Sequence, residues 1–144
     1  MFLALASVMA LTGAAQAQVN DADLKWGPAP PGLPAGSQMA VLAGDPTKAG
    51  TFVIRAKMPA GYKVPAHHHP TDEYITVISG DLSLGMGDKL DTAKAAHLAP
   101  GGFAQAGANM NHYAWSEKGG VIQISAEGPF AITYVDPKDD PRKP

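Results

Sequence analysis

Glycine and proline divide this chain into short segments, which limits the folds open to it. Its 144 residues include 16 glycines and 13 prolines, and short apolar runs without a long helical period lie between them. In residues 52–58, apolar side chains at the even positions alternate with Val53, Arg55 and Lys57. Such alternation predicts a strand with one core-facing side. Several short strands of this kind predict an all-β sandwich or barrel.

The other strands are expected from the same signals. We also expect a turn at residues 85–88 and one helical turn at about 91–94. The expected strands cover residues 39–42, 52–58, 73–79, 82–84, 103–106, 113–116, 121–126 and 130–135.

A chain of this length supports one hydrophobic core, and we place that domain at residues 37–136. Residues 18–36 are rich in proline and glycine and should form an extended arm. We expect its Trp26 to pack against the domain or against a neighbouring subunit. Residues 137–144 form a charged tail that we expect to lie in solvent.

The N-terminal 17 residues have the pattern of a secretory signal peptide. An apolar run is followed by small residues that end in Ala15-Gln16-Ala17, an Ala-x-Ala cleavage pattern. We therefore expect a periplasmic or secreted protein. The usual basic n-region is missing, so the true start could lie upstream, or the segment could be a membrane anchor or a buried helix. The apolar run is shorter than the ~20 residues of a spanning helix, and no stable membrane insertion is expected after cleavage.

Charge and cysteine content exclude several functions. The net charge is −2 and no basic patch is present, which argues against nucleic-acid binding. The chain has no cysteine. Disulfides, thiolate ligands and thiol catalysis are therefore excluded, and any metal ligand must offer nitrogen or oxygen.

A histidine cluster carries the strongest functional signal. In an extended segment, His67 and His69 point to one face and His68 to the other. Glu73 shares its face with Ile75 and Val77, so we expect it to point inward. A buried carboxylate is costly unless a cation compensates it, which favours a metal site over an exposed polar loop.

These residues resemble the first motif of the cupin superfamily, in which glycine, His-x-His, glutamate and glycine follow at fixed spacings. The matching positions are Gly61, His67, His69, Glu73 and Gly80. The resemblance implies a jelly-roll barrel, an antiparallel double sheet, here with a proline-rich N-terminal arm.

The second cupin motif is also present in altered form, and it supplies His112 as a further ligand. Gly101 and His112 keep its spacing. Gly107 stands where the family has proline, Asn109 where it has glycine, and Ser116 where asparagine is often seen. Because asparagine tolerates positive φ, we expect Asn109 to keep the tight turn.

Three imidazoles and one carboxylate suit one divalent iron, copper, manganese, nickel or zinc ion, and the ligand set does not choose among them. In tetrahedral zinc the four ligands would close the site and favour a structural role. Octahedral iron or manganese would keep two adjacent positions free. Glu73 is the candidate catalytic residue, as a ligand that could also act as a base.

Other side chains could line a cavity or lie behind the ligands, although packing in the core is the simpler expectation for each. Tyr113 and Gln123 are the better candidates, because each has a polar group that must be satisfied. We expect His97 to lie at the surface and Asp72 to lie in a turn or in solvent. The candidates are Phe52, Met58, Tyr62, Met110, Tyr113, Trp115 and Gln123.

The resemblance favours an exported metal-dependent oxidoreductase, of dioxygenase or oxidase type, acting on a small organic or carbohydrate substrate. A non-redox isomerase or lyase and a non-catalytic ligand- or metal-binding module remain the alternatives. We also expect a homodimer, because cupin sheets tend to pair and the arm could reach a neighbour.

Overall fold

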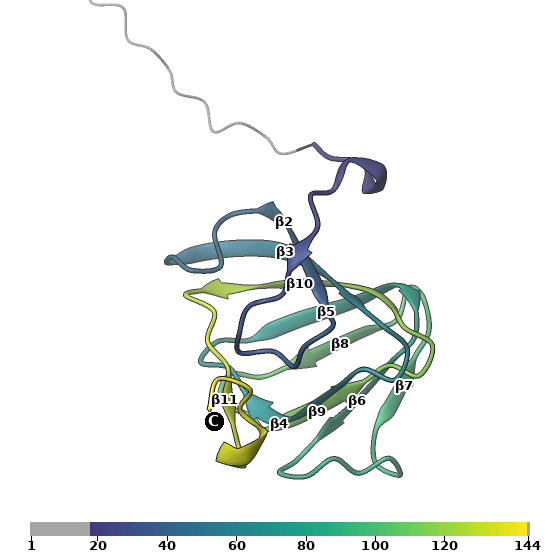
Figure 1. Cartoon of the computed structure of the whole chain (residues 1–144), viewed down its shortest axis with the longest axis vertical. Coiled ribbons are helices and arrows are strands. Elements are labelled where there is room, and N and C mark those ends of the chain that lie inside the picture. Colours follow the sequence, from purple (N-terminus) through teal and green to yellow (C-terminus); the bar gives the residue numbers. More distant parts are fainter. Residues whose placement is uncertain (1–17, 144) are drawn as a thin grey trace, which may run out of the picture.

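The computed structural model describes residues 18–143, which form two antiparallel sheets that face each other (Figure 1). The expected all-β jelly roll is confirmed. The expected signal peptide, residues 1–17, lies outside the described residues. In the order of its neighbours, the six-stranded sheet consists of β1 (Gly27–Pro28), β2 (Gln38–Ala43), β3 (Gly50–Met58), β10 (Gly120–Gly128), β5 (Glu73–Gly80) and β8 (Phe103–Ala106).

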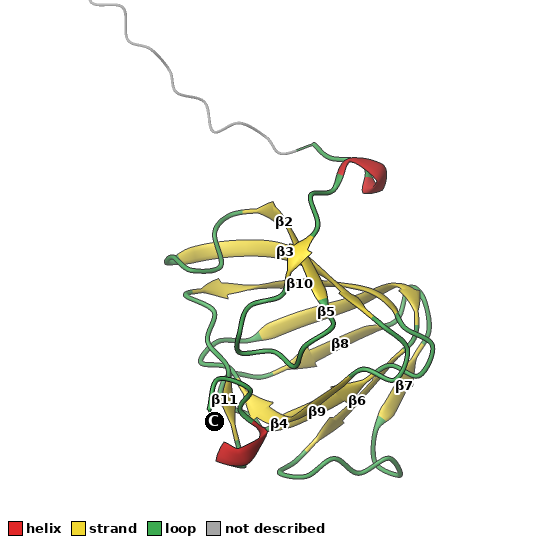
Figure 2. Cartoon of the chain, in the orientation of Figure 1, coloured by secondary structure: helices red, strands yellow, loops and turns green. Residues whose placement is uncertain are grey.

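The five-stranded sheet lies opposite and carries most of the motif histidines. Its order is β11 (Thr133–Tyr134), β4 (Lys63–His68), β9 (His112–Trp115), β6 (Leu82–Met86) and β7 (Ala96–Leu98). Two short 3-10 helices, η1 (Asp21–Asp23) and η2 (Pro137–Asp139), are the only helices among the described residues (Figure 2). Within residues 18–143, no helix is long and apolar enough to cross a membrane.

The core fills the space between the sheets. Phe52, Ile54 and Met58 of β3 are buried, as their alternation predicts. Ile75 and Val77 of β5 are also buried. Because β10 pairs with both β3 and β5, its inward side chains complete this face.

An irregularity in β4 sets the direction of the first histidine. Val64 faces the core, whereas Ala66 packs with Tyr113 on the outer side of the sheet. The pairing of β4 with β9 shifts register between Val64 and His67. Strict alternation would place Val64 and His67 on opposite faces, so this bulge, which contains Pro65, turns His67 inward.

Some expected elements differ from the structure. β6 continues to Met86, because Gly85 pairs with Tyr113 in the ladder and has no side chain to overlap the tyrosine ring. The expected helical turn is a single turn in which Lys94 N donates to Asp91 O at 3.2 Å. Of the strand expected over residues 130–135, only β11 forms. The residues before it leave the sheet, because Phe130 and Ala131 contact His69.

The proline-rich segment packs on its own domain rather than extending away from it. Residues 29–37 run over one end of the barrel (Figure 1). Tyr62 Oη donates to Pro34 O at 2.6 Å, and Tyr134 Oη donates to Gly32 O at 2.8 Å. Trp26 lies beneath Lys57, whose Nζ is 4.2 Å from the ring centroid. The expectation that Trp26 contacts the domain is therefore met within one chain.

The charged tail also folds back in part. Asp136 Oδ1 accepts from Lys138 N and starts η2. Arg142 donates to Ile132 O at 3.0 Å and to both carboxylate oxygens of Asp140. The tail thus closes over the loop before β11 instead of lying wholly in solvent.

Candidate metal centre

Three histidines and one glutamate meet at the inner face of the barrel. His67 lies near the end of β4, His69 directly follows this strand, and His112 begins β9. One ring nitrogen from each histidine lies within 4.8 Å of those of the other two. Glu73, the first residue of β5, places Oε2 3.5 Å from His69 Nε2 and 3.3 Å from His112 Nε2. All four side chains are buried.

Backbone carbonyls fix the tautomer of each histidine. His67 Nδ1 lies 2.7 Å from Pro65 O, His69 Nδ1 lies 2.7 Å from Ala131 O, and His112 Nδ1 lies 3.0 Å from Met110 O. A carbonyl oxygen only accepts, so each Nδ1 must carry the proton. In the neutral ring Nε2 then has a free lone pair. Three such lone pairs face the same small space, as metal ligation requires.

His112 Nε2 is buried, and its contact with Glu73 Oε2 at 3.3 Å does not have the geometry of a hydrogen bond. An unpartnered buried nitrogen is costly. A divalent ion would satisfy this lone pair and would also compensate the buried charge of Glu73. The residues present therefore fit a metal ion, and His67, His69 and His112 could hold it with Glu73 beside them.

Burial and mutual contact shift the pKa values in this cluster. Burial lowers the pKa of His67 to about 3, with His112 and His69 adding to the effect. Burial also lowers the pKa of His69. Burial would raise the pKa of Glu73, but its contact with His112 holds it below the usual value. That contact, against the effect of burial, raises the pKa of His112. Without a metal, the Glu73 carboxylate lies against the rings of His112 and His69 and is the group that offsets the effect of burial on the pKa of His112.

The altered second motif still forms a tight turn beside the histidines. Asn109 has φ of 60°, in the left-handed region that the sequence led us to expect. Its N–H donates to His69 O at 2.7 Å, and Met110 N donates to Gly107 O at 3.0 Å. Asp72, on the other side of the chain from Glu73, accepts from Ala108 N at 2.8 Å. The turn is thereby tied to the first motif, and Met110 O is positioned for His112.

The loop before β11 is a part of the site that the sequence did not reveal. Phe130 stacks on the ring of His69, with centroids 4.4 Å apart and planes at 24°, and Ala131 O accepts from His69 Nδ1. The apolar run after Gly128 indicated a strand. Only its closeness to His69 in space gives it a role in the site.

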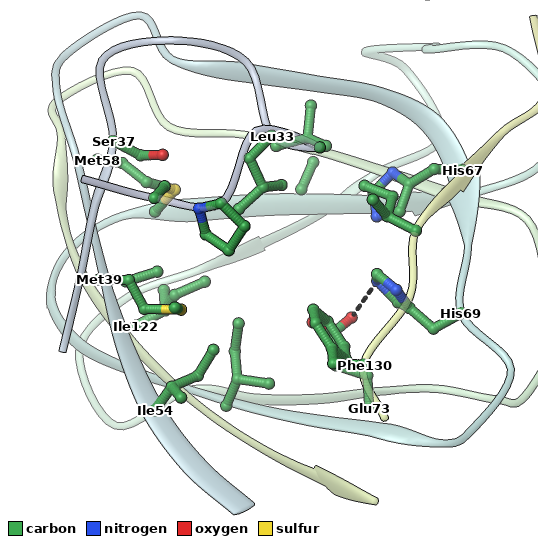
Figure 3. A pocket seen from close by; sticks show the side chains of 18 of the residues that line it. Leu33, Ser37, Met39, Ile54, Met58, His67, His69, Glu73, Ile122 and Phe130 are labelled. Atoms are coloured by element: carbon green, nitrogen blue, oxygen red, sulfur yellow. Dashed lines mark ion pairs between the residues drawn. The ribbon is translucent and has the colours of Figure 1, made fainter. Parts of the chain in front are cut away.

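A cavity of about 370 Å³ opens beside the four residues. Figure 3 shows His67, His69 and Glu73 on one side of it and Ser37, Met39, Ile54, Met58 and Ile122 on the other, with Leu33 above. Phe130 lies next to Glu73 in this view. The arm, both sheets and the loop before β11 all contribute to the wall.

Tyr62 and Met58 line this cavity, but the other expected cavity residues do not. Tyr113 and Trp115 alternate with inward residues of β9, so they point to the outer side of the sheet and stack there, covered by Leu90 and Ala95. Tyr113 Oη is satisfied by Asp91 O at 3.0 Å rather than by a metal ligand.

Gln123, Met110 and Phe52 do not line the cavity either, and Phe52 follows the simpler expectation of packing in the core. Gln123 accepts from Arg55 Nε at 3.2 Å on the outer face of the six-stranded sheet, because it pairs with Arg55 in the ladder. Met110 is 53% exposed at the turn. Phe52 lies in the core and contacts the ring of Phe130 edge-on at 5.3 Å.

The remaining histidines lie outside the cluster, as strand phase predicts for His68 and as we expected for a surface His97. His68 Nδ1 lies 3.0 Å from Asn111 Oδ1, and Asn111 Nδ2 donates to Asp88 at 2.7 Å. His97 is exposed on β7, where its Nδ1 lies 2.6 Å from Ser83 Oγ.

Two facing antiparallel sheets with a histidine cluster on their inner side form a cupin-type jelly roll, and solved cupin structures share this fold. More narrowly, the chain belongs to the family described as a domain of unknown function, DUF4437, whose model matches residues 15–133. No curated protein matches this sequence.

Among similar solved structures is a putative acetylacetone dioxygenase from Methylibium petroleiphilum PM1, with TM-score 0.67, 21% identity, and coverage of 92% of this chain and 90% of that one. The polyketide cyclase RemF from Streptomyces resistomycificus has TM-score 0.67 and 16% identity, with 86% and 88% covered. KdgF from Halomonas sp. has TM-score 0.56 and 19% identity, with 76% and 91% covered. At these identities the likeness concerns the fold.

Proposed function

We propose that this protein is a mononuclear metalloenzyme, a metal-dependent oxidoreductase that acts on a small organic molecule. The observation that carries the proposal is the convergence of three Nε2 lone pairs beside buried Glu73, on the wall of a cavity. A purely structural metal site needs no cavity. The likeness to the Methylibium protein, which is described as a putative acetylacetone dioxygenase, supports the redox class.

The chain's residues would hold the metal and prepare the cavity. His67, His69 and His112 would bind it through Nε2, with Glu73 as the fourth ligand. When bound, iron, copper or manganese would supply Lewis acidity and redox chemistry. Phe130 and the mostly apolar wall would disfavour water in this space. The Glu73 carboxylate lies on the wall, where it is positioned to accept a proton from a bound molecule.

A non-redox reaction is the second candidate. The polyketide cyclase RemF resembles this chain at the same TM-score as the Methylibium protein, which supports an isomerase- or lyase-like function as well. In that case the metal would act without electron transfer. A binding module without catalysis is the third possibility.

Metal analysis followed by oxygen uptake separates these functions. Protein purified without added metal is analysed for metal content and then assayed with a panel of small organic compounds. We expect oxygen consumption that is lost in His69→Ala and retained in His68→Ala, whose histidine lies outside the cluster. Conversion without oxygen uptake would contradict the redox function and favour an isomerase or lyase. A ligand that raises the melting temperature without being converted would favour a binding module.

We further propose that the protein is exported after cleavage at Ala17. The pattern of residues 1–17 supports this. N-terminal sequencing of protein from the periplasmic fraction should begin at Gln18, whereas an intact N-terminus in the cytoplasmic fraction would contradict export.

A homodimer is also proposed. Three large side chains support it, because Tyr74, Ile78 and Phe103 lie exposed on the outer face of the six-stranded sheet. Light scattering after size exclusion should give twice the chain mass, and Phe103→Glu should reduce it to the monomer mass. A monomer in the unmodified protein would contradict this proposal.

A further inference from the structure

The wall of the cavity has a polar end and a larger apolar region. The polar end consists of His67, His69, His112 and Glu73. Away from this end the lining is mostly aliphatic, and includes Leu33, Met39, Ile54, Met58, Ile122 and Ile124. Arg142 and Gln38 also border the cavity, but Gln38 is exposed and Arg142 is bonded to Asp140 and Ile132 O.

The polar groups opposite the histidines are already occupied. Tyr62 Oη donates to Pro34 O at 2.6 Å, so the hydrogen of Ser37 Oγ is the one shared in its 2.9 Å contact with Tyr62 Oη. Neither hydroxyl has a free hydrogen to offer to a ligand. Along the aliphatic part of the wall, a molecule with hydroxyl groups along its length would lose most of its hydrogen bonds to water without replacement. This disfavours the carbohydrate substrates that the sequence left open.

The charge of the polar end selects the head group. The carbonyl partners of the three Nδ1 atoms make the ligating imidazoles neutral, so a divalent ion with ionised Glu73 has a net charge of about +1. Beside an apolar wall, that charge favours one anionic oxygen group. The cavity volume of about 370 Å³ lies at the small end of ligand pockets, which limits the size of the rest of the molecule.

We propose that this cavity binds a small amphiphile, with a single anionic oxygen head group at the histidines and an uncharged apolar body against Met39, Ile54 and Ile122. The inference rests on the proposed function, because the head group is assigned to the metal. The assignment of the apolar body depends only on the residues that line the cavity, not on the metal.

Calorimetric binding of straight-chain carboxylates to the zinc-loaded protein tests this. Zinc has no redox chemistry, so binding is measured without oxidative turnover. From acetate upward, affinity should rise about fourfold per methylene until the cavity is full, and then stop rising. Gluconate, a six-carbon carboxylate with hydroxyl groups, should bind much more weakly than hexanoate. Affinity that is independent of chain length, or gluconate binding as tightly as hexanoate, would overturn the proposal.

Two substitutions at the apolar wall test the placement of the body. Ala56 of β3 also lines the cavity, and Ala56→Leu should weaken the longest carboxylates that the unmodified protein binds and leave acetate unchanged. Met39→Ala should move the best chain length upward. Melting curves show that each variant is folded. If neither variant changes the preferred length, the body does not lie where we place it.

The zinc-free protein separates this inference from the proposed function. It should keep the dependence on chain length and lose the part of the affinity that comes from the head group. Equal affinity with and without zinc would overturn the assignment of the head group. If the protein binds no zinc, the proposed metal function fails, and the chain-length dependence still tests the apolar body.

Discussion

Hydrogen bonds to the backbone fix the ring orientation of each histidine in the site. Each of the three histidines has its Nδ1 committed to a backbone carbonyl, so only Nε2 can face the centre. The sequence indicated which residues cluster but not these carbonyls, which belong to Pro65, Met110 and Ala131. Two of them lie two residues before their histidine, whereas Ala131 is distant in the chain. That contact could not be predicted from local pattern.

Removal of one ligand should abolish metal retention. In His112→Ala the set loses one of its three imidazole nitrogens, and metal content by elemental analysis should fall from about one per chain to near zero. His68→Ala removes a neighbouring histidine that bonds to Asn111 instead, and should retain the metal. Equal metal content in the two variants would contradict the assignment.

Metal affinity should depend on pH through His112. The contact with Glu73 raises the pKa of His112 in the metal-free protein, and ligation requires Nε2 without its proton. Below this pKa the metal must displace one proton from His112. The apparent metal affinity should therefore fall about tenfold for each unit by which the pH is lowered. His67, with its pKa lowered to about 3, should not contribute near neutral pH. Competition with a chelator between about pH 5 and pH 8 measures this. A flat profile would be inconsistent with the pair.

Asn109 should tolerate glycine but not a β-branched residue. Its φ of 60° lies where glycine is free and where valine is strained. We expect Asn109→Gly to change the unfolding free energy by less than about 0.5 kcal/mol and Asn109→Val to cost about 1–3 kcal/mol. Urea unfolding measures both. Equal stability of the valine variant would argue against the turn described here.

At the scale of elements, strand phase predicted the inward residues of β3 and β5 and the separation of His68 from its neighbours. Relative to His112, strand phase also places Tyr113 and Trp115 on the outer face, but their polar and aromatic groups made them candidates for the cavity. Here residues 87–95 cover the outer face of β9. It also gave no sign of the bulge at Pro65 or of the arm over the cavity, since both depend on contacts between distant segments.

The arm should depend on Tyr62. Tyr62→Phe removes the group that bonds to Pro34 O and Ser37, and should lower the unfolding free energy by about 1–2 kcal/mol. Tyr74→Phe is the matched control, because that hydroxyl is exposed and its contact with Asp72 is 3.3 Å long. It should change stability by less than about 0.5 kcal/mol. If both variants were equally stable in urea, the arm would not be held as we describe.

At the scale of the whole molecule, the two sheets, the arm and the loop before β11 enclose one space. The larger sheet contributes Glu73, the smaller contributes His67 and His112, and the loop supports His69. The jelly roll and the four clustered residues follow from the spacing of short strands and motifs in the sequence. The shape and apolar character of the cavity do not, because segments far apart in the chain form its wall.

The most direct test of the metal centre is an anomalous difference map from crystals of the metal-loaded protein. We predict one strong peak per chain, bounded by Nε2 of His67, His69 and His112 and by the carboxylate of Glu73. A peak at His68 or His97, or none at the cluster in metal-loaded crystals, would contradict the account.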